Sequence, residues 1–415
     1  ADRHRRRGVI GSSVARIGVG RLHVTSLFVL AVVLYLPAVG NGFHYDDFHS
    51  IVTNPHVRSL DRLGDFFVDP NLFSQNPESA MYRPVLLTSY ALTHAIGELD
   101  PASFHAGNVL LQGIHVALLY GLLLALGMSP SLAIVAGLVF SVTPLNSEAV
   151  NYVSSRSELL MATFLLASCL CYVRSMATGP YRAAWFAIAV VSATLAILTK
   201  SVAVITVPLW VLCDWLSSGT WKSAWTERRF HHLIMLSVIA LYLAFSRSLI
   251  GKALLTPIRD LDVQLWTQIK AWVYYLTMLP FPVHLSVDRQ FVVSKSLLDG
   301  PVMVAGLMLV SLVVVLLLGS REPRNRVGQW TRLGIGWAAI SLLPSAVVPL
   351  VVLVNEHRCY LASAGAAIAV ASCLGRILER RRLLSVVSVA VWVVVAVALT
   401  VDRGNAWKDE VALWR

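Results

Sequence analysis

The sequence predicts an all-α polytopic membrane protein with about eleven transmembrane helices. Three observations support this fold class. First, 56% of the residues are hydrophobic and only 14% are charged. Second, the mean hydropathy is +0.67, which ordinary water-soluble domains do not reach. Third, apolar runs long enough to cross a bilayer recur along the chain.

These apolar runs give the expected spans in chain order. A span needs about 20 largely apolar residues, or fewer where flanking side chains reach toward the interface. By this criterion we expect spans near Leu22–Ala38, Phe104–Leu126, Ser131–Leu145, Leu159–Val173, Ala183–Leu198, Val202–Leu216, Leu233–Leu249, Val302–Leu318, Leu333–Val354, Tyr360–Leu378 and Leu383–Val401.

Two other apolar segments are too polar for a full span. Leu265–Phe281 contains Gln268 and Lys270 among Trp and Tyr residues, which favour the membrane interface. Tyr82–Gly97 begins with Arg83 and Pro84 and includes further polar residues. We expect both to be outer-surface helices, juxtamembrane or re-entrant, and a shallow transmembrane hairpin is the alternative for Tyr82–Gly97.

The distribution of the net charge of +11 along the chain indicates the membrane topology. With a cytoplasmic N-terminus, the inside segments carry 19 of the 34 Lys and Arg residues but only 5 of the 23 acidic residues, as the positive-inside rule requires. The chain then divides into a basic cytoplasmic tail (1–21), a transmembrane domain (22–401) and an outer C-terminal stub (402–415). Within the domain, 39–103 and 250–300 form outer loops.

Several other classes are excluded or disfavoured by the same distribution. The cationic clusters lie in short loops without interleaved aromatic residues, so nucleic acid is not an expected partner. The five cysteines suggest neither a disulfide framework nor a metal cluster, because four of them fall within expected spans. The first apolar run exceeds the ~7 to 15 residues of a signal-peptide core, so we expect it to be retained as a span.

The adjacent carboxylates Asp46 and Asp47, just after the first span, are the strongest candidates for chemistry. Neighbouring acids raise each other's pKa, and one that stays ionised near an apolar surface can accept a proton from a hydroxyl. His44 and His49 flank the pair. A solvated loop with a helix N-cap is the competing interpretation.

Further charged residues gather on the same outer side. Ionisable groups at a membrane boundary are costly and therefore functional candidates, although ion pairs between helix ends and lysine snorkelling are constant alternatives. A guanidinium or ammonium group can stabilise a phosphate there, which would suit phosphate-linked lipid chemistry. The expected phosphate ligands are Arg83, Arg156, Lys200 and Arg358, and the supporting residues are His49, His105, Glu148, Glu158 and Glu356.

Motifs spread over almost the whole chain resemble the transmembrane and TPR-containing O-mannosyltransferase family, part of the GT-C superfamily of lipid-phosphate-sugar glycosyltransferases. They occur in family order, which makes chance an unlikely source. The motifs are Phe43–Ile51 with Asn54, Tyr82-Arg83-Pro84, His105 with Asn108–Leu111, Thr143-Pro144 to Val150, Ser155–Leu160, and Glu356-His357-Arg358 to Leu361 with Ser363.

The resemblance implies a GT-C-like fold and an inverting mannosyltransferase that uses a polyprenyl-phosphate sugar at the extracytoplasmic face. It places the catalytic base at Asp46 or Asp47 and the lipid phosphate among the outer basic residues. Ser or Thr of a protein is the favoured acceptor, and a glycan or lipid acceptor remains open. A polyprenyl-lipid transporter or flippase and a non-catalytic scaffold are the rival functions.

The chain departs from the family pattern at two positions. Family members usually have His-Pro where this chain has Thr143-Pro144, and often Lys-Glu where it has Lys200-Ser201. The missing histidine and acid put any metal role or acceptor contact at those positions in doubt. Two adjacent acids such as Asp46 and Asp47 could chelate a divalent metal, but the second outer loop has no obvious Asp-x-Asp partner, so metal independence is favoured. TPR repeats would follow Trp407–Trp414 in the family. The Arg-, Ala- and Val-rich composition favours a bacterial plasma membrane over the endoplasmic reticulum.

Overall fold

The computed structural model describes residues 20–76, 79–247, 258–280, 282, 285–287, 289–318, 326–349, 351–380, 382–408 and 410–413. The described residues are mainly helical and contain no strand, so the all-α class is confirmed. Most of the expected N-terminal tail, part of the 250–300 loop and the last residues of the stub lie outside the described residues.

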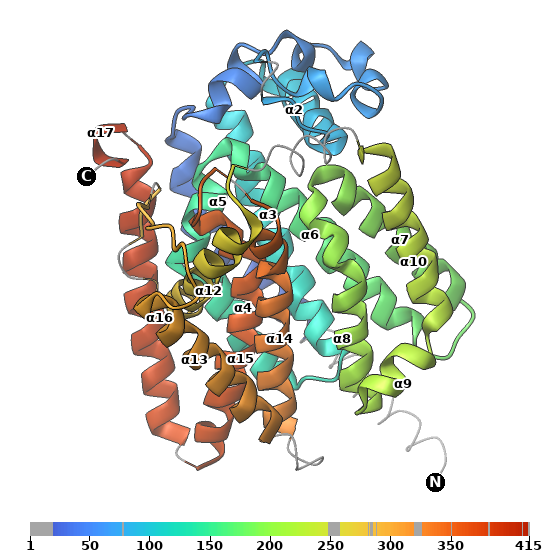
Figure 1. The fold of residues 1–415 in the computed structure, drawn as a ribbon, viewed down its shortest axis with the longest axis vertical. Coiled ribbons are helices and arrows are strands. Elements are labelled where there is room, and N and C mark those ends of the chain that lie inside the picture. Colours follow the sequence, from blue (N-terminus) through green and yellow to red (C-terminus); the bar gives the residue numbers. More distant parts are fainter. Residues whose placement is uncertain are drawn as a thin grey trace.

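The described helices pack into one bundle, shown with their labels in Figure 1. Short 3-10 or π-helical turns occupy the segment between Leu36 and Phe73. The helices are the first helix with its terminal turn (Gly20–Gly40), α2 (Pro84–Gly97), α3 (Pro101–Ala125), α4 (Pro130–Val142), α5 (Ser147–Asn151), α6 (Arg156–Ser175), α7 (Arg182–Thr199), α8 (Thr206–Ser218), α9 (Trp221–Thr226), α10 (Arg229–Phe245), α12 (Leu261–Met278), α13 (Gly300–Leu318), α14 (Arg326–Val347), α15 (Tyr360–Arg380), α16 (Arg382–Ala406) and α17 (Glu410–Leu413).

Every expected span is helical over most of its described length. Among the described residues, seven helices are long and apolar enough to cross a membrane, a bent pair would make an eighth, and the apolar helices Arg229–Phe245 and Gly300–Leu316 are shorter. The membrane class is therefore confirmed, while the number of about eleven spans stays a prediction. Leu265–Phe281 and Tyr82–Gly97 correspond to α12 and α2.

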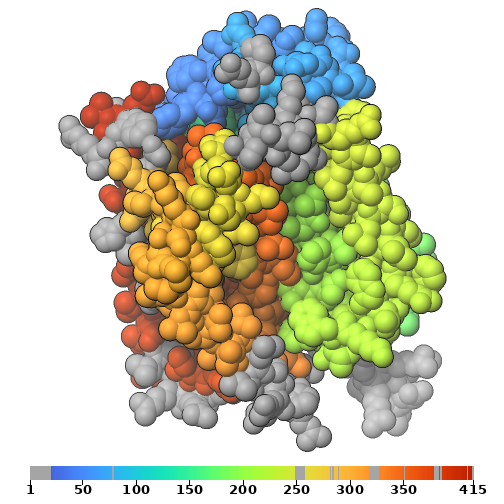
Figure 2. Space-filling view, in the orientation of Figure 1, coloured from blue at the N-terminus to red at the C-terminus, as the bar shows by residue number. Residues whose placement is uncertain are grey.

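The two ends of the bundle differ in character. The segment from Asn41 to α2 caps the upper end in Figure 1, where α17 also lies, and α9 lies at the lower end. Figure 2 shows this N-terminal cap in blue over the bundle. The cap has its own small apolar core, in which Ile51, Phe66 and Tyr90 are buried. It is thus a packed layer above the helices.

The chain bends at Pro144, between α4 and α5. Pro144 lacks a backbone N–H, and a residue that precedes proline is disfavoured in the helical region. Thr143 is accordingly extended (φ −68°, ψ 126°), and α4 ends at Val142. The chain then bends by 54° between Pro130–Val142 and Pro144–Asn151. This bend places α5, and with it Glu148, at the upper end.

Glycines allow two C-terminal helices to approach closely. A Cβ at Gly334 on α14 would lie 2.4 Å from the carbonyl oxygen of Gly365 on α15, and the reverse distance is also 2.4 Å. Lipid tails are as apolar as a helix surface, so the hydrophobic effect does not drive helices together in a membrane. Small residues at a helix crossing favour association because they let the two backbones pack closely. The α14–α15 pair is therefore a tight unit, and α15 begins directly after Glu356-His357-Arg358.

Candidate active site

The Asp46-Asp47 pair lies in a strained turn at the upper end of the bundle. Tyr45, immediately before the pair, has φ +42°, in the left-handed region that non-glycine residues rarely adopt. The backbone N–H of His44 donates to Asp47 Oδ2 at 3.0 Å. Ser154 donates to Asp47 Oδ1 twice, from its N–H at 2.7 Å and from its hydroxyl at 2.5 Å. These bonds fix the Asp47 carboxylate in place.

Burial changes the acidity of Asp47. The residue is fully buried, and burial raises the pKa of its carboxyl from an ordinary 3.8 to about 7, while the bonds from Ser154 and His44 act in the opposite direction. The charge of nearby Asp46 adds a smaller increase to this pKa. Asp47 is therefore an anchored, weakly acidic group with its lone pairs largely occupied.

Asp46 presents the opposite environment. Its side chain is 66% exposed, and Oδ1 lies 3.4 Å from His49 Nε2. Its backbone is held instead, because the Asp46 N–H donates to the Tyr152 hydroxyl at 3.0 Å and its carbonyl accepts from Ser50 at 2.6 Å. The turn thus offers one accessible carboxylate on a fixed backbone.

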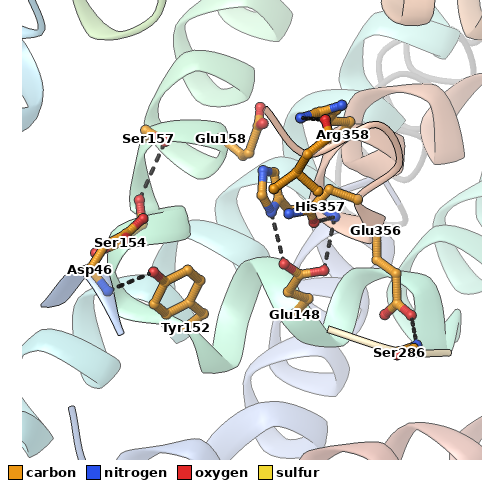
Figure 3. A network of polar contacts seen from close by, with 12 residues as sticks. Asp46, Glu148, Tyr152, Ser154, Ser157, Glu158, Ser286, Glu356, His357 and Arg358 are labelled. Atoms are coloured by element: carbon orange, nitrogen blue, oxygen red, sulfur yellow. Dashed lines mark hydrogen bonds and ion pairs between the residues drawn. The ribbon is translucent and has the colours of Figure 1, made fainter. Parts of the chain in front are cut away.

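A second group of charges surrounds Glu158, at the start of α6. Lys200 follows α7 and forms an ion pair with Glu158, with side-chain exposures of only 13% and 6%. Glu158 also interacts electrostatically with Arg83 and His357. Arg358 donates to the carbonyls of Val352 and Leu353 and lies beside Glu158 and His357 (Figure 3).

The mutual effects of these cations show that they share one region. Burial lowers the pKa of Lys200, Glu158 raises it, and the charges of Arg83 and Arg358 lower it further. Burial likewise lowers the pKa of Arg83, which Glu158 and, more weakly, Asp46 raise. Arg83, Lys200 and Arg358 are half-buried. Arg83 and Lys200 interact with Glu158, and Arg358 interacts with Glu148. The three cations outnumber these two carboxylates, which gives an excess of positive charge suited to an anion.

A third group joins α5 to the segment before α15. The ring Nδ1 of His357 lies 2.8 Å from Glu148 Oε1, and the His357 N–H donates to Oε2 at 3.1 Å (Figure 3). Glu356 accepts from the N–H of Ser286 and from Arg403 Nη2 at 3.3 Å. These contacts orient the loop that carries Arg358.

The structure separates Arg156 from the other predicted phosphate ligands. Its guanidinium donates to Asn108 Oδ1 at 2.9 Å, to Thr93 Oγ1 at 2.8 Å and to the Phe104 carbonyl at 2.6 Å. It also lies over the rings of Tyr90 and Phe104. Arg156 joins α2, α3 and α6, and this placement does not support the predicted phosphate contact.

The two supporting histidines lie on different elements, His49 in the cap and His105 on α3. His49 contacts Asp46, as described above, and its Nδ1 lies 3.0 Å from the Ser74 hydroxyl. His105 is buried, and its Nε2 lies 3.1 Å from the carbonyl of Gly42. His49 is thus adjacent to the accessible carboxylate, whereas His105 supports the chain that leads into the turn.

Sequence reasoning missed four residues that shape the site: Tyr152, Ser154, His357 and Arg403. Ser154 and His357 lie in or beside the polar segments that the sequence singled out, so their neighbours gave a signal. Tyr152 and Arg403 gave none, because their contacts join segments far apart in the chain.

The chain is similar in sequence to several known proteins. Residues 89–253 match the family described as dolichyl-phosphate-mannose-protein mannosyltransferase. A protein O-mannosyl-transferase of Caenorhabditis elegans is 24% identical over 405 residues, which cover 94% of this chain and 56% of the worm protein. The chain resembles the protein O-mannosyl-transferases.

Other protein O-mannosyl-transferases match over shorter regions. A relative of that name from Xenopus laevis is 32% identical over 155 residues, 37% of this chain and 18% of the frog protein. The chain therefore spans about half the length of the worm O-mannosyl-transferase and a smaller part of the frog enzyme.

Two solved structures of the Archaeoglobus fulgidus oligosaccharyltransferase also align with the chain. One is a complex with an inhibitory peptide and a dolichol-phosphate, with a TM-score of 0.43 and 10% identity, and the other is the apo form, with a TM-score of 0.44 and 11% identity. Each alignment covers 94% of this chain and 56% of the other.

Proposed function

We propose that this chain is a GT-C-type membrane glycosyltransferase that transfers mannose from a polyprenyl-phosphate-linked donor to a Ser or Thr hydroxyl of a protein. The sequence similarity to protein O-mannosyl-transferases supports the sugar and the acceptor class. The observation that carries the proposal is the exposed Asp46 carboxylate within electrostatic reach of Arg83, which belongs to a half-buried cationic cluster.

Asp46 is the general base in this proposal. A general base must approach the hydroxyl whose proton it removes, and only an accessible carboxylate can do so. Asp46 is mostly exposed, whereas Asp47 is buried and accepts three hydrogen bonds. Asp47 then serves as the anchor that holds the turn, and His49 borders the position where the acceptor hydroxyl binds.

The donor phosphate is assigned to the cluster of Arg83, Lys200 and Arg358. Their excess positive charge, partly shielded from water, would stabilise the negative charge that develops on the leaving phosphate. Glu158 holds Lys200 in position through their ion pair. The lipid tail would lie between helices at the membrane face of this cluster.

The reaction is a single displacement. The acceptor oxygen forms a bond to the anomeric carbon as the bond from that carbon to the phosphate oxygen breaks. The hydroxyl proton passes to Asp46, and the lipid phosphate leaves with the bonding electron pair. One displacement inverts the anomeric configuration.

The proposal places no divalent metal in the site. Two adjacent acids could chelate a cation, but the Asp47 oxygens already accept hydrogen bonds from His44 and Ser154. The cationic cluster would supply the charge stabilisation that a metal provides in other phosphate sites.

The active site is proposed to face the extracytoplasmic side. The positive-inside rule puts the basic segments around α9 in the cytoplasm, and Asp46 and Lys200 belong to segments at the other end. The sequence relatives reported above are animal proteins, which gives the expected bacterial plasma membrane no support. An endomembrane location fits those relatives.

Transfer of labelled mannose from polyprenyl-phosphate-mannose by the purified protein tests the proposal, with peptide, glycan and lipid acceptors in parallel. Asp46→Asn should lower turnover about 10²- to 10⁴-fold. Asp65→Asn, an exposed acid of the same cap, is the matched control and should retain turnover. Full activity of Asp46→Asn would refute the assigned base, and lipid movement without sugar transfer would favour a flippase.

A further inference from the structure

The C-terminal end of α16 contacts the Asp46-Asp47 turn. Trp407, one residue beyond α16, is fully buried. Its carbonyl lies 2.9 Å from His44 Nε2. Its ring stacks on Tyr152, with a centroid distance of 5.7 Å and an interplanar angle of 20°. More than 350 residues of chain separate Trp407 from this turn, so the contact is a tertiary one.

Each contact of Trp407 leads directly to one of the two carboxylates. His44, which bonds to the Trp407 carbonyl, donates its own N–H to Asp47 Oδ2. Tyr152, which stacks on the Trp407 ring, accepts the N–H of Asp46 with its hydroxyl. The Trp407 ring also lies edge-to-face against His44, with a centroid distance of 5.8 Å and an interplanar angle of 71°. Trp407 thus stands one residue away from both Asp46 and Asp47, and its ring contacts both intermediate residues.

The turn requires such support. Tyr45 adopts a left-handed conformation that is unfavourable for a residue with a Cβ, and such strain persists only where surrounding contacts over-determine it. The hydrogen bonds to Ser154 fix one side of the turn. Trp407, through His44 and Tyr152, fixes the other side.

The same helix end reaches the second part of the site. Arg403 lies four residues before Trp407, on the same face of the helix end. Its Nη2 lies 3.3 Å from Glu356 Oε2, next to the His357-Arg358 pair. The last turn of α16 therefore touches both the carboxylate turn and the loop that carries Arg358.

We propose that Trp407 is a positioning residue for the Asp46-Asp47 pair, so that the end of α16 sets the geometry of the general base. This inference rests on the proposed function, since it assumes that Asp46 takes a proton from the acceptor. Trp407 contacts no substrate in this assignment; it acts through Tyr152 and His44.

Kinetics of Trp407→Ala separate positioning from simple structural support. A misplaced base slows the chemical step, so turnover should fall at least tenfold while the KM for the lipid donor changes less than twofold. Trp407→Phe keeps an aromatic ring against Tyr152 and should retain most of the turnover. A loss confined to donor KM, or full turnover in Trp407→Ala, would overturn the inference.

Trp210 provides a matched control. It is also fully buried and stacks on a tyrosine, Tyr172, at 4.2 Å, but it lies on α8 away from the cap. Trp210→Ala should lower the melting temperature about as much as Trp407→Ala yet leave turnover per folded molecule unchanged. Equal loss of turnover in both variants would show that Trp407 acts only through general stability.

Hydrogen exchange tests the inference independently of catalysis. The amides of Asp46, Asp47 and Phe48 are hydrogen-bonded in the turn. Trp407→Ala should make them exchange at least tenfold faster, and Trp210→Ala should not. If the wild type transfers no mannose but this difference is seen, the proposed function fails while the coupling stands; unchanged exchange overturns the coupling itself.

A second variant covers the case in which Trp407→Ala does not fold. Tyr152→Phe keeps the ring that stacks on Trp407 and removes only the hydroxyl that accepts the Asp46 N–H. It should lower turnover several-fold and accelerate exchange at Asp46. Wild-type values of both would contradict the proposed route from Trp407 to the base.

Discussion

Ser154 donates two hydrogen bonds to the same carboxylate oxygen of Asp47, one from its backbone N–H at 2.7 Å and one from its hydroxyl at 2.5 Å. The serine begins the polar segment that leads into α6, so it links the carboxylate turn to the helix that carries Glu158. The two parts of the site are therefore connected through a short stretch of chain.

The Asp47 carboxyl should give the protein a measurable pH dependence of stability. Its pKa is raised to about 7 in the folded state, so the folded protein binds this proton more tightly than the unfolded chain. The stabilisation is fully present below about pH 4 and is lost as the pH rises through about 7. The Asp47→Asn variant has no carboxyl at this position, so it lacks this pH-dependent contribution to stability.

The melting temperature of the wild type relative to Asp47→Asn should therefore fall between about pH 4 and pH 7 and level off at higher pH. Thermal unfolding in detergent at several pH values measures the difference. Parallel curves for the two proteins would show that Asp47 does not titrate in this range.

Opposite substitutions within the cationic cluster should have opposite effects on donor binding. Lys200→Gln removes a positive charge and should weaken binding of polyprenyl phosphate about tenfold, ~1.4 kcal/mol. Glu158→Gln removes a carboxylate that partly neutralises these cations, so it should strengthen the binding of polyprenyl phosphate. Equilibrium binding of the lipid phosphate checks both, and weakening by both changes would argue against an anion site here.

Arg156→Ala should act on stability, in contrast to Lys200→Gln. The change removes hydrogen bonds to Asn108, Thr93 and Phe104 and leaves their acceptors unpaired in the interior. A loss of about 2–4 kcal/mol is expected, with unchanged affinity of the folded fraction for lipid phosphate. Differential scanning fluorimetry beside the same binding assay measures both, and weak lipid binding with normal stability would restore Arg156 as a phosphate ligand.

Gly365→Ala should destabilise the α14–α15 pair. The new Cβ would meet the carbonyl oxygen of Gly334 at 2.4 Å, which is backbone and cannot move aside. Overpacking of this kind costs about 1–3 kcal/mol, or more where backbone must shift. Gly306→Ala on α13, where nothing lies within 4 Å, is the control and should leave the melting temperature unchanged.

Removal of divalent cations should leave mannose transfer unchanged. The proposed charge stabilisation comes from Arg83, Lys200 and Arg358, and these side chains need no metal. Turnover with excess chelator, with and without added Mg²⁺ or Mn²⁺, checks this. Activity that disappears with chelator and returns with one cation would require a metal at Asp46.

Sequence reasoning predicted the helical segments because apolar length is a local property. Each expected span, and both α2 and α12, proved helical in the described residues. Polar segments that the sequence analysis assigned to one side of the membrane, such as those of Glu148, Glu158 and Glu356, lie close together in the structure (Figure 3), while the side itself stays a prediction. Pairings such as Lys200 with Glu158 or Trp407 with Tyr152 depend on how helices cross, which periodicity does not encode.

Helix geometry distinguishes two of the predicted site residues, Arg156 and Glu158. Arg156 and Glu158 are two residues apart on α6, and consecutive helical residues turn by about 100°, so their side chains point in nearly opposite directions. The two side chains therefore leave α6 on different faces. Glu158 faces Lys200, and Arg156 therefore turns toward α2 and α3.

The proline break after α4 changes what kind of segment carries Glu148. At 13 residues, α4 is only about 20 Å long, which is well short of a hydrocarbon core of about 30 Å. The helix and the bent segment that follows it, Pro144–Asn151, are long enough for a span only when they are taken together. Glu148 therefore belongs to the bent half of a broken span and not to a loop, and its distance from the membrane centre is set by the angle at Pro144.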